Sequence, residues 1–342
     1  MEDEMTKARL LVVWCLALGF ISIGILEAAE AGQPSIRLTT DTPETMPLGR
    51  AAAWFGQEIE RRLPRSEVMI FNSSSLYDNT DSLEAMHAGT LEACWATSSK
   101  IAGIIPEALC LRIPTLFSDY SQVQKIPGTK IGQYISKACE KKGFVLLSWG
   151  NLSPHIGVAS KSRILSPSEW DGKKVRIYEK EVQKIMVREL GGNPIVMPWG
   201  EFVPSVQSGV VDAGFASLSS WEKVKETLPY FTSVGMVPDF YIFLVAKRWW
   251  AKLDDPTRRI VSEVATEAAA KQTQWQYEKD QVDTKALGTD DPSRPGFYRL
   301  SPDQLKPYEE KWATPTRKIV QRKIGKSGED ILNQIIELSR RP

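Results

Sequence analysis

One short pattern occurs twice in this chain, 120 residues apart, and it constrains the fold more than any other feature. The first copy is GTLEACWATSS at Gly89–Ser99, and the second is GVVDAGFASLSS at Gly209–Ser220. Aligned on the glycines, both copies place acidic, small, aromatic and hydroxyl residues at the same positions, with Trp95 matching Phe215. The elements that flank the copies also agree in type and order. The pattern therefore indicates a structural unit that is present once in each half of the chain.

The first half of the chain alternates between predicted strands and predicted helices. Strands are expected at 35–40, 67–71 and 91–97, and helices at 46–63 and 81–89. The first of these helices has apolar residues at helical spacing, namely Leu48, Ala52, Phe55, Ile59 and Leu63. Such an alternation is typical of an α/β lobe with a largely parallel sheet.

The second half repeats the same alternation around the second copy of the pattern. Strands are expected at 172–178, 194–199 and 210–217, with helices at 179–190 and 201–209 between them. Pro204 is tolerated because it lies in the first turn of its helix. The sequence thus predicts two lobes of one design.

The remaining segments predict how the two lobes are joined. Apolar stretches at 143–150 and 239–250 are expected to connect them, and 256–282 is expected to be a long helix that braces both. The chain from Ser301 onward predicts two more helices. The predicted lobes are residues 32–152 with about 245–282, and residues 153–244 with about 283–342.

The N-terminus predicts export from the cytoplasm. Lys7 and Arg9 precede an apolar run from Leu10 to Leu26, and a small-x-small motif ends at Ala31. This order describes a secretory signal peptide over residues 1–31. An uncleaved membrane anchor is the alternative, because the run is near the lower length limit for a span.

Composition and motif content argue against several classes of function. The net charge is +1, from 43 basic and 42 acidic residues, and nucleic acid is not an expected partner because its binding needs a basic patch. Cys94, Cys110 and Cys139 form an odd set without metal-site spacing, which favours buried thiols and leaves one disulfide open. Enzyme motifs are absent from the sequence, and it has two histidines, His87 and His155. No catalytic residue, metal or cofactor is predicted.

The ends of the predicted strands supply a candidate site. Ligands of open α/β sheets bind beyond the carboxyl ends of the strands. The predicted strand of the first copy ends at Thr97 and Ser98 and that of the second at Ser217, so we expect these residues on opposite walls of one cleft. Trp199 follows another strand of the second lobe and adds an indole suited to a small polar ligand.

Longer stretches resemble a known family. DGKKVRIY and GGNPIVMPWGEFVPSVQSGVVDAG in the second half, and SLEAMHAGTLEACWATSS and IPEALCLRIPTLFSDY in the first, are similar to the solute-binding proteins of TRAP-type (tripartite ATP-independent periplasmic) transporters, dicarboxylate-receptor class. The resemblance runs from about Ser35 to the C-terminus. It implies an α/β, two-lobed periplasmic solute-binding fold with hinge strands and a long bracing helix, which closes on its ligand.

The resemblance also implies a function and partners. A member of this family is a monomeric periplasmic receptor, not an enzyme, that captures an organic acid and delivers it to TRAP membrane permease subunits. Two alternatives remain at this stage. One is an exported enzyme that uses the cleft, for which His155 is the nearest histidine, and the other is a sensory or scaffold protein.

The resemblance assigns roles to residues of the second lobe. Arg176 corresponds to the family's arginine that clamps a ligand carboxylate, and a guanidinium suits this role because its planar fork matches both carboxylate oxygens. An exposed arginine paired with a glutamate is the alternative. Trp199 corresponds to an aromatic residue that lines the cleft, with a core tryptophan as the alternative.

Other positions match the family less fully. Thr97 and Ser98 match contacts of the first lobe, whereas Lys100 matches a basic residue of acid-sugar binders or is a solvated surface charge. His155 is a candidate second anion contact, where many members carry an arginine. Ala216 replaces an expected asparagine beside Ser217, which predicts a smaller or less polar ligand than a sialic-acid-type one.

Overall fold

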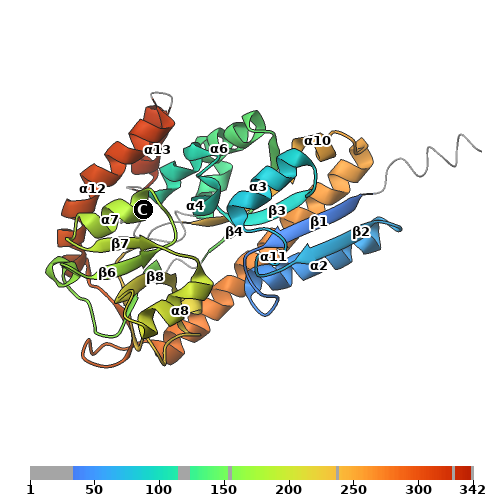
Figure 1. The fold of residues 1–342 in the computed structure, drawn as a ribbon. Coiled ribbons are helices and arrows are strands. Elements are labelled where there is room, and N and C mark those ends of the chain that lie inside the picture. The colour runs from blue at the N-terminus through green and yellow to red at the C-terminus, as the bar shows by residue number, and fades with distance from the viewer. Residues whose placement is uncertain (1–33, 115–123, 153–155, 236–238, 326–327, 340–342) are drawn as a thin grey trace, which may run out of the picture.

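The computed structural model describes residues 34–114, 124–152, 156–235, 239–325 and 328–339 (Figure 1). The predicted signal peptide over residues 1–31 and the candidate His155 lie outside the described residues. Two mixed sheets and the helices that cover them make up the described structure, so the expected two-lobed α/β fold is confirmed.

The first sheet has the strand order β2-β1-β3-β10-β4. β1 runs parallel to both β2 and β3, whereas β10 is antiparallel to both β3 and β4. The strands are β1 (Ser35–Thr40), β2 (Glu67–Phe71), β3 (Ala93–Thr97), β4 (Phe144–Asn151) and β10 (Phe240–Ala246).

The second sheet repeats this arrangement and adds one edge strand, in the order β11-β9-β5-β8-β6-β7. β6 is parallel to β7 and β8, and β5 is antiparallel to β8 and β9. The strands are β5 (Ile156–Ser160), β6 (Lys174–Ile177), β7 (Asn193–Val196), β8 (Ala213–Ser217), β9 (Tyr230–Ser233) and β11 (Gly296–Arg299).

The two copies of the repeated pattern occupy equivalent central strands. β3 lies between the parallel β1 and the antiparallel β10, and β8 lies between the parallel β6 and the antiparallel β5. The sheets are mixed, and not largely parallel as expected, because each central strand has one antiparallel neighbour: β10 beside β3, and β5 beside β8. These two neighbours follow the segments that link the lobes. β10 belongs wholly to the first sheet, so this sheet resumes at Phe240 and not near residue 245.

Helices cover the faces of both sheets. α2 begins with Pro47, as favoured at a helix N-terminus, and buries Leu48, Phe55 and Ile59 on one face. In chain order, the described helices are α2 (Pro47–Arg62), α3 (Asn79–Ala88), α4 (Ser98–Ile101), α6 (Lys130–Lys141), α7 (Val182–Arg188), α8 (Trp199–Gln207), α9 (Leu218–Trp221), α10 (Lys247–Trp250), α11 (Asp255–Leu287), α12 (Pro302–Ile324) and α13 (Glu329–Ser339). Short 3₁₀ helices are η1 (Pro106–Arg112), η2 (Ile126–Gly128) and η3 (Pro167–Trp170).

The long helix α11 joins the two halves, as Figure 1 shows in orange. It packs on α2 and β4 of the first half and reaches α9 and β11 of the second. Its first half buries Val261, Val264, Ala265, Ala268 and Ala269, whereas its second half buries the polar Gln272, Gln276, Asp280 and Asp283. The side chain of Gln272 exchanges two hydrogen bonds with the backbone of Asn151, where β4 leaves the first sheet.

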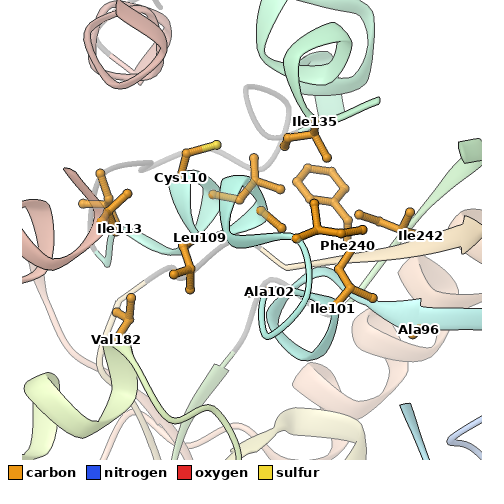
Figure 2. Packing of buried hydrophobic residues seen from close by; sticks show 14 of the residues in the cluster. Ala96, Ile101, Ala102, Leu109, Cys110, Ile113, Ile135, Val182, Phe240 and Ile242 are labelled. Carbon is orange, nitrogen blue, oxygen red and sulfur yellow. The ribbon is translucent and has the colours of Figure 1, made fainter. Parts of the chain in front are cut away.

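The largest apolar cluster is continuous between the two sheets. Figure 2 shows Leu109 of η1 pointing toward Val182 of α7, with Phe240 of β10 beside Ile101 of α4. Cys94, Cys110 and Cys139 are buried free thiols, in agreement with the favoured reading of the cysteines. Within the part of the chain that the structure describes, no helix is both long and apolar enough to span a membrane.

Candidate functional site

Arg176 lies in β6 and is buried, with 3% of its surface exposed. Its Nε donates to the carbonyl of Met197 at 3.1 Å, and its Nη1 donates to the carbonyl of Phe215 at 2.8 Å. A guanidinium has five N–H groups. These two bonds fix its orientation and leave Nη2 and the second N–H of Nη1 for another acceptor.

Aromatic rings surround this guanidinium. Its Cζ lies 5.1 Å from the ring centre of Tyr178, 5.5 Å from that of Trp199 and 5.6 Å from that of Phe202. Burial lowers the pKa of Arg176 to about 10, although Tyr178 acts in the opposite direction. No acidic side chain among the described residues forms an ion pair with Arg176. An anion that reached the free N–H groups would thus meet a preoriented, largely desolvated cation.

Gly214 makes room for this arrangement. It is the register partner of Arg176 in the neighbouring strand β8. A Cβ atom at Gly214 would lie 2.4 Å from Cζ of Phe202 and 3.0 Å from Cβ of Arg176. The ring of Phe202 occupies the space that a side chain would fill, so glycine is required here for packing.

A second buried arginine connects this region to the first half of the chain. Arg112 of η1 forms an ion pair with Asp239 at 3.2 Å, and both side chains are fully buried. The nearby phenol of Tyr178 also favours the charged form of Arg112. Burial disfavours the charged form of Arg112, but Asp239 and Tyr178 outweigh it, so the pKa of Arg112 is raised. Tyr178 therefore lies against the guanidinium of Arg176 and is influenced by the charge of Arg112 from the first half.

The hydroxyl groups predicted to face a ligand are engaged in local hydrogen bonds. Ser98 donates to Asp239 at 2.5 Å, and the hydroxyl of Thr97 accepts from Ser99 at 3.1 Å. Ser217 caps α9, because its hydroxyl accepts from the amide of Ser220 at 3.2 Å. Thr97 and Ser217 end β3 and β8 as expected, and Ser98 begins α4 directly after β3. Their hydroxyls form hydrogen bonds with the protein's own groups.

Lys100 and Trp199 are the two remaining candidate site residues that the structure describes. Lys100 of α4 forms an ion pair with Asp41 at 2.5 Å, and its side chain is 30% exposed. Trp199 is 37% exposed at the start of α8, so it is not a core tryptophan. The structure thus brings Arg176 and Trp199 together and ties Thr97 and Ser98 to the Asp239 cluster.

Four residues of this region were not predicted from the sequence. Tyr178 and Phe202 had a local signal: Tyr178 follows Arg176 by two residues, directly after the end of β6, and Phe202 follows Trp199 by three in one helix. Arg112 and Asp239 had none, because they lie far apart in the chain and meet only through the tertiary fold.

A hollow of about 540 Å³ lies at the opposite ends of the strands of the second sheet. It is lined by residues that precede β6 and β8 and follow β5, among them Lys161, Asp171 and Asp212. None of the predicted site residues contributes to it.

Two α/β halves of equivalent topology, linked by the long helix α11, define a two-lobed α/β fold. Residues 38–323 match the family model described as bacterial extracellular solute-binding protein, family 7. The chain belongs to this family.

Relatives and solved structures agree with this assignment. The chain is 27% identical over 277 residues to a solute-binding protein of Chromohalobacter salexigens, covering 78% of this chain and 81% of the relative. It is 23% identical over 272 residues to the C4-dicarboxylate-binding periplasmic protein DctP of Rhodobacter capsulatus, covering 78% and 80%. The crystal structure of a TRAP periplasmic solute binding protein from Shewanella oneidensis, with bound succinate, is similar with a TM-score of 0.81 at 21% identity, covering 90% of this chain and all of that one. A second, from Chromohalobacter salexigens with bound D-glucuronate, has a TM-score of 0.79 at 22% identity, covering 89% and 99%.

Proposed function

We propose that this protein is a periplasmic receptor that captures a small molecule bearing a carboxylate and delivers it to the membrane permease of a TRAP transporter. Membership of the solute-binding family supports the receptor role, and the relatives' names and bound acids support the class of ligand. The family and its structural neighbours are receptors, which weighs against an enzyme in the cleft.

One observation carries the assignment of the ligand class. Arg176 is buried, held by two carbonyls and three aromatic rings, and has no acidic partner among the described residues. An isolated charge is costly to bury, typically by several kcal/mol. A ligand carboxylate that accepts from Nη1 and Nη2 offsets that cost, and Trp199 lies beside it at the entrance of α8.

The proposal also includes a closing motion of the lobes and a monomeric state of the receptor. Closure of the lobes around the hinge strands and α11 brings the first-sheet side of the site onto the ligand, as in the general hinge mechanism of periplasmic binding proteins. We infer lobes that divide near residues 152, 240 and 282, and a monomer that meets the permease as its membrane partner.

The test is a thermal-shift screen of the purified protein against organic acids, followed by titration calorimetry of the hits. A ligand at about a hundred times its Kd adds about 2.7 kcal/mol of stability, which raises Tm by several degrees. We expect hits that carry a carboxylate, bind one to one and are not chemically converted.

Arg176→Lys keeps the charge but loses the planar fork, so we expect its affinity to fall roughly 10- to 150-fold. Arg163→Lys is the matched control, because the guanidinium of Arg163 donates to the carbonyls of Phe231 and Gly296 within its own lobe. This control should change Tm and leave Kd unchanged. Unchanged affinity in Arg176→Lys would remove the clamp.

A further inference from the structure

The backbone that carries Tyr178 is held by a side chain of the next helix. β6 ends at Ile177, and its pairing with β7 ends at the same residue. Beyond that point, Oε1 of Gln183 accepts from the amide of Tyr178 at 3.0 Å and from the amide of Glu179 at 3.2 Å. Gln183 lies in α7 and is only 1% exposed. Two backbone amides of this turn are therefore paired by one buried side chain.

Glu179 completes a reciprocal arrangement with Gln183. Its carboxylate accepts from the backbone amides of Val182 at 2.8 Å and Gln183 at 2.9 Å, and also from that of Glu181. Each of Glu179 and Gln183 thus accepts from the amide of the other, as the two partners of a capping box do. The turn between β6 and α7 is closed from both sides. The carboxylate nearest in sequence to Arg176 is consequently bound at the start of α7.

The position of this turn matters because the ring of Tyr178 packs on the proposed clamp. Cζ of Arg176 lies 5.1 Å from the centre of that ring. Nε and Nη1 of the same guanidinium already donate to two backbone carbonyls. A guanidinium that is held in place before binding loses less conformational freedom when a carboxylate arrives. A shift of the backbone at Tyr178 would move the ring and loosen the guanidinium.

We propose that Gln183 is a positioning residue of the carboxylate clamp: by holding the amides of Tyr178 and Glu179, it fixes the ring that keeps the guanidinium of Arg176 oriented for a ligand. Gln183 acts through the turn and needs no contact with the ligand itself. This inference rests on the proposed function, because the clamp has no role without a carboxylate to bind. A glutamine that only stabilised α7 would leave the guanidinium of Arg176 unaffected.

The orientation of the guanidinium can be measured without any ligand. In isotopically labelled protein, the Nε–H signal of Arg176 is identified by its loss in Arg176→Lys, and its exchange with water is followed by NMR. Gln183→Met keeps the length of the side chain and removes the acceptor. We expect the Nε–H of Arg176 to exchange at least about tenfold faster in this variant. Exchange at the wild-type rate would overturn the inference, whether or not any acid binds.

Gln304→Met is the matched control. Oε1 of Gln304 accepts from the amide of Ser301 at 2.9 Å, and the amide of Gln304 donates to the hydroxyl of Ser301 at 3.3 Å, a reciprocal arrangement of the same kind at the start of α12. Its loss should lower Tm and leave both the Nε–H exchange of Arg176 and the affinity for a ligand unchanged. Equal acceleration in the two variants would indicate a general loosening of the protein and would remove the specific role of Gln183.

Calorimetry with succinate and D-glucuronate, the acids bound in two of the structural neighbours, measures the effect on a ligand. We expect Gln183→Met to weaken the binding of whichever acid the wild type takes by about tenfold. In the Tyr178→Leu background the same substitution should have little further effect, because Gln183 acts through Tyr178. A full additional loss in that background contradicts this route. If the wild type binds no carboxylate, the proposed function fails, whereas the exchange measurement still decides whether Gln183 holds the guanidinium.

Tyr178→Leu gives a second route if Gln183→Met does not fold. This variant keeps the backbone bonds to Gln183 and removes the ring, so the Nε–H exchange of Arg176 should accelerate as in Gln183→Met. Exchange at the wild-type rate in Tyr178→Leu would mean that the ring does not orient the guanidinium, and the role of Gln183 would fall with it.

Discussion

The two sheets share one arrangement of their five common strands, and one pair of equivalent positions differs in a way that bears on the site. In the first sheet, Thr39 of β1 is the register partner of Cys94 in β3. In the second, Arg176 of β6 is the register partner of Gly214 in β8. Thr39 is buried and its hydroxyl donates to carbonyls of its own lobe. The same scaffold thus holds a threonine whose hydroxyl is hydrogen-bonded within its own lobe, and an arginine that keeps N–H groups for a further acceptor.

This difference shows how a repeated structural unit can carry the proposed site in only one of its two copies. Glycine at position 214 admits the ring of Phe202, which packs over the guanidinium of Arg176. Cysteine at the equivalent position of the first copy fills that space, and Cys94 is fully buried in the apolar core. One small residue therefore distinguishes the apolar strand pair of the first lobe from the strand pair that carries the proposed carboxylate clamp.

The hydroxyls after the two central strands differ in the same sense. In the first copy, Ser98 stabilises the buried Asp239 and thereby the Arg112 ion pair. In the second copy, Ser217 caps the short helix α9. In the first lobe the polar groups form a buried network with Arg112. In the second lobe Arg176 has no acidic partner among the described residues.

The largest effect is expected from breaking the network of the first copy. Asp239→Asn leaves Arg112 buried without a counter-charge, so the free energy of unfolding should fall by about 3–5 kcal/mol. Urea unfolding followed by tryptophan fluorescence measures this loss. A change below about 1 kcal/mol, as expected for an exposed pair, would show that the network contributes little.

Exchanging the residue that distinguishes the two copies comes next. In Gly214→Cys the new side chain must displace Phe202, and we expect a cost of about 1–3 kcal/mol in stability from overpacking. Because Phe202 and Arg176 are in contact, ligand affinity should fall as well. Calorimetry on the folded variant decides the matter, and an affinity equal to that of the wild type would mean that Gly214 serves packing alone.

The two serines that follow the central strands are expected to differ, with Ser217 giving the smallest effect of all. Ser98→Ala removes a hydrogen bond to a buried charge, and it should cost about 1.5–3 kcal/mol. Ser217→Ala removes a helix cap and should cost about 1 kcal/mol. Parallel urea titrations compare them, and equal losses in the two variants would contradict the asymmetry described above.

Much of the fold could be predicted from the sequence, because local patterns encode it. The strands at 35–40 and 67–71 were predicted with their observed bounds, and the long helix was predicted within five residues at its C-terminal end. The sheet membership of β10 was not, since an apolar strand does not state which neighbours it pairs with. The ion pairs of Arg112 and Lys100 depend on partners brought from distant strands, and local sequence carries no signal for them.

Of the predicted site residues, Arg176 was identified through the family resemblance, and its surroundings now give a physical reason for that role. The hydroxyl of Ser217 caps α9, because a serine that ends a strand and precedes a helix is well placed for capping. Its contact with a ligand stays a prediction. The role of Arg176 as a carboxylate clamp stays a prediction.

The most direct test of that claim is a crystal structure of the protein with its tightest-binding organic acid. The account predicts one ligand carboxylate that accepts from Nη1 and Nη2 of Arg176 at about 2.7–2.9 Å, while the bonds to Met197 and Phe215 persist. A ligand whose carboxylate lies away from Arg176 would contradict the central claim.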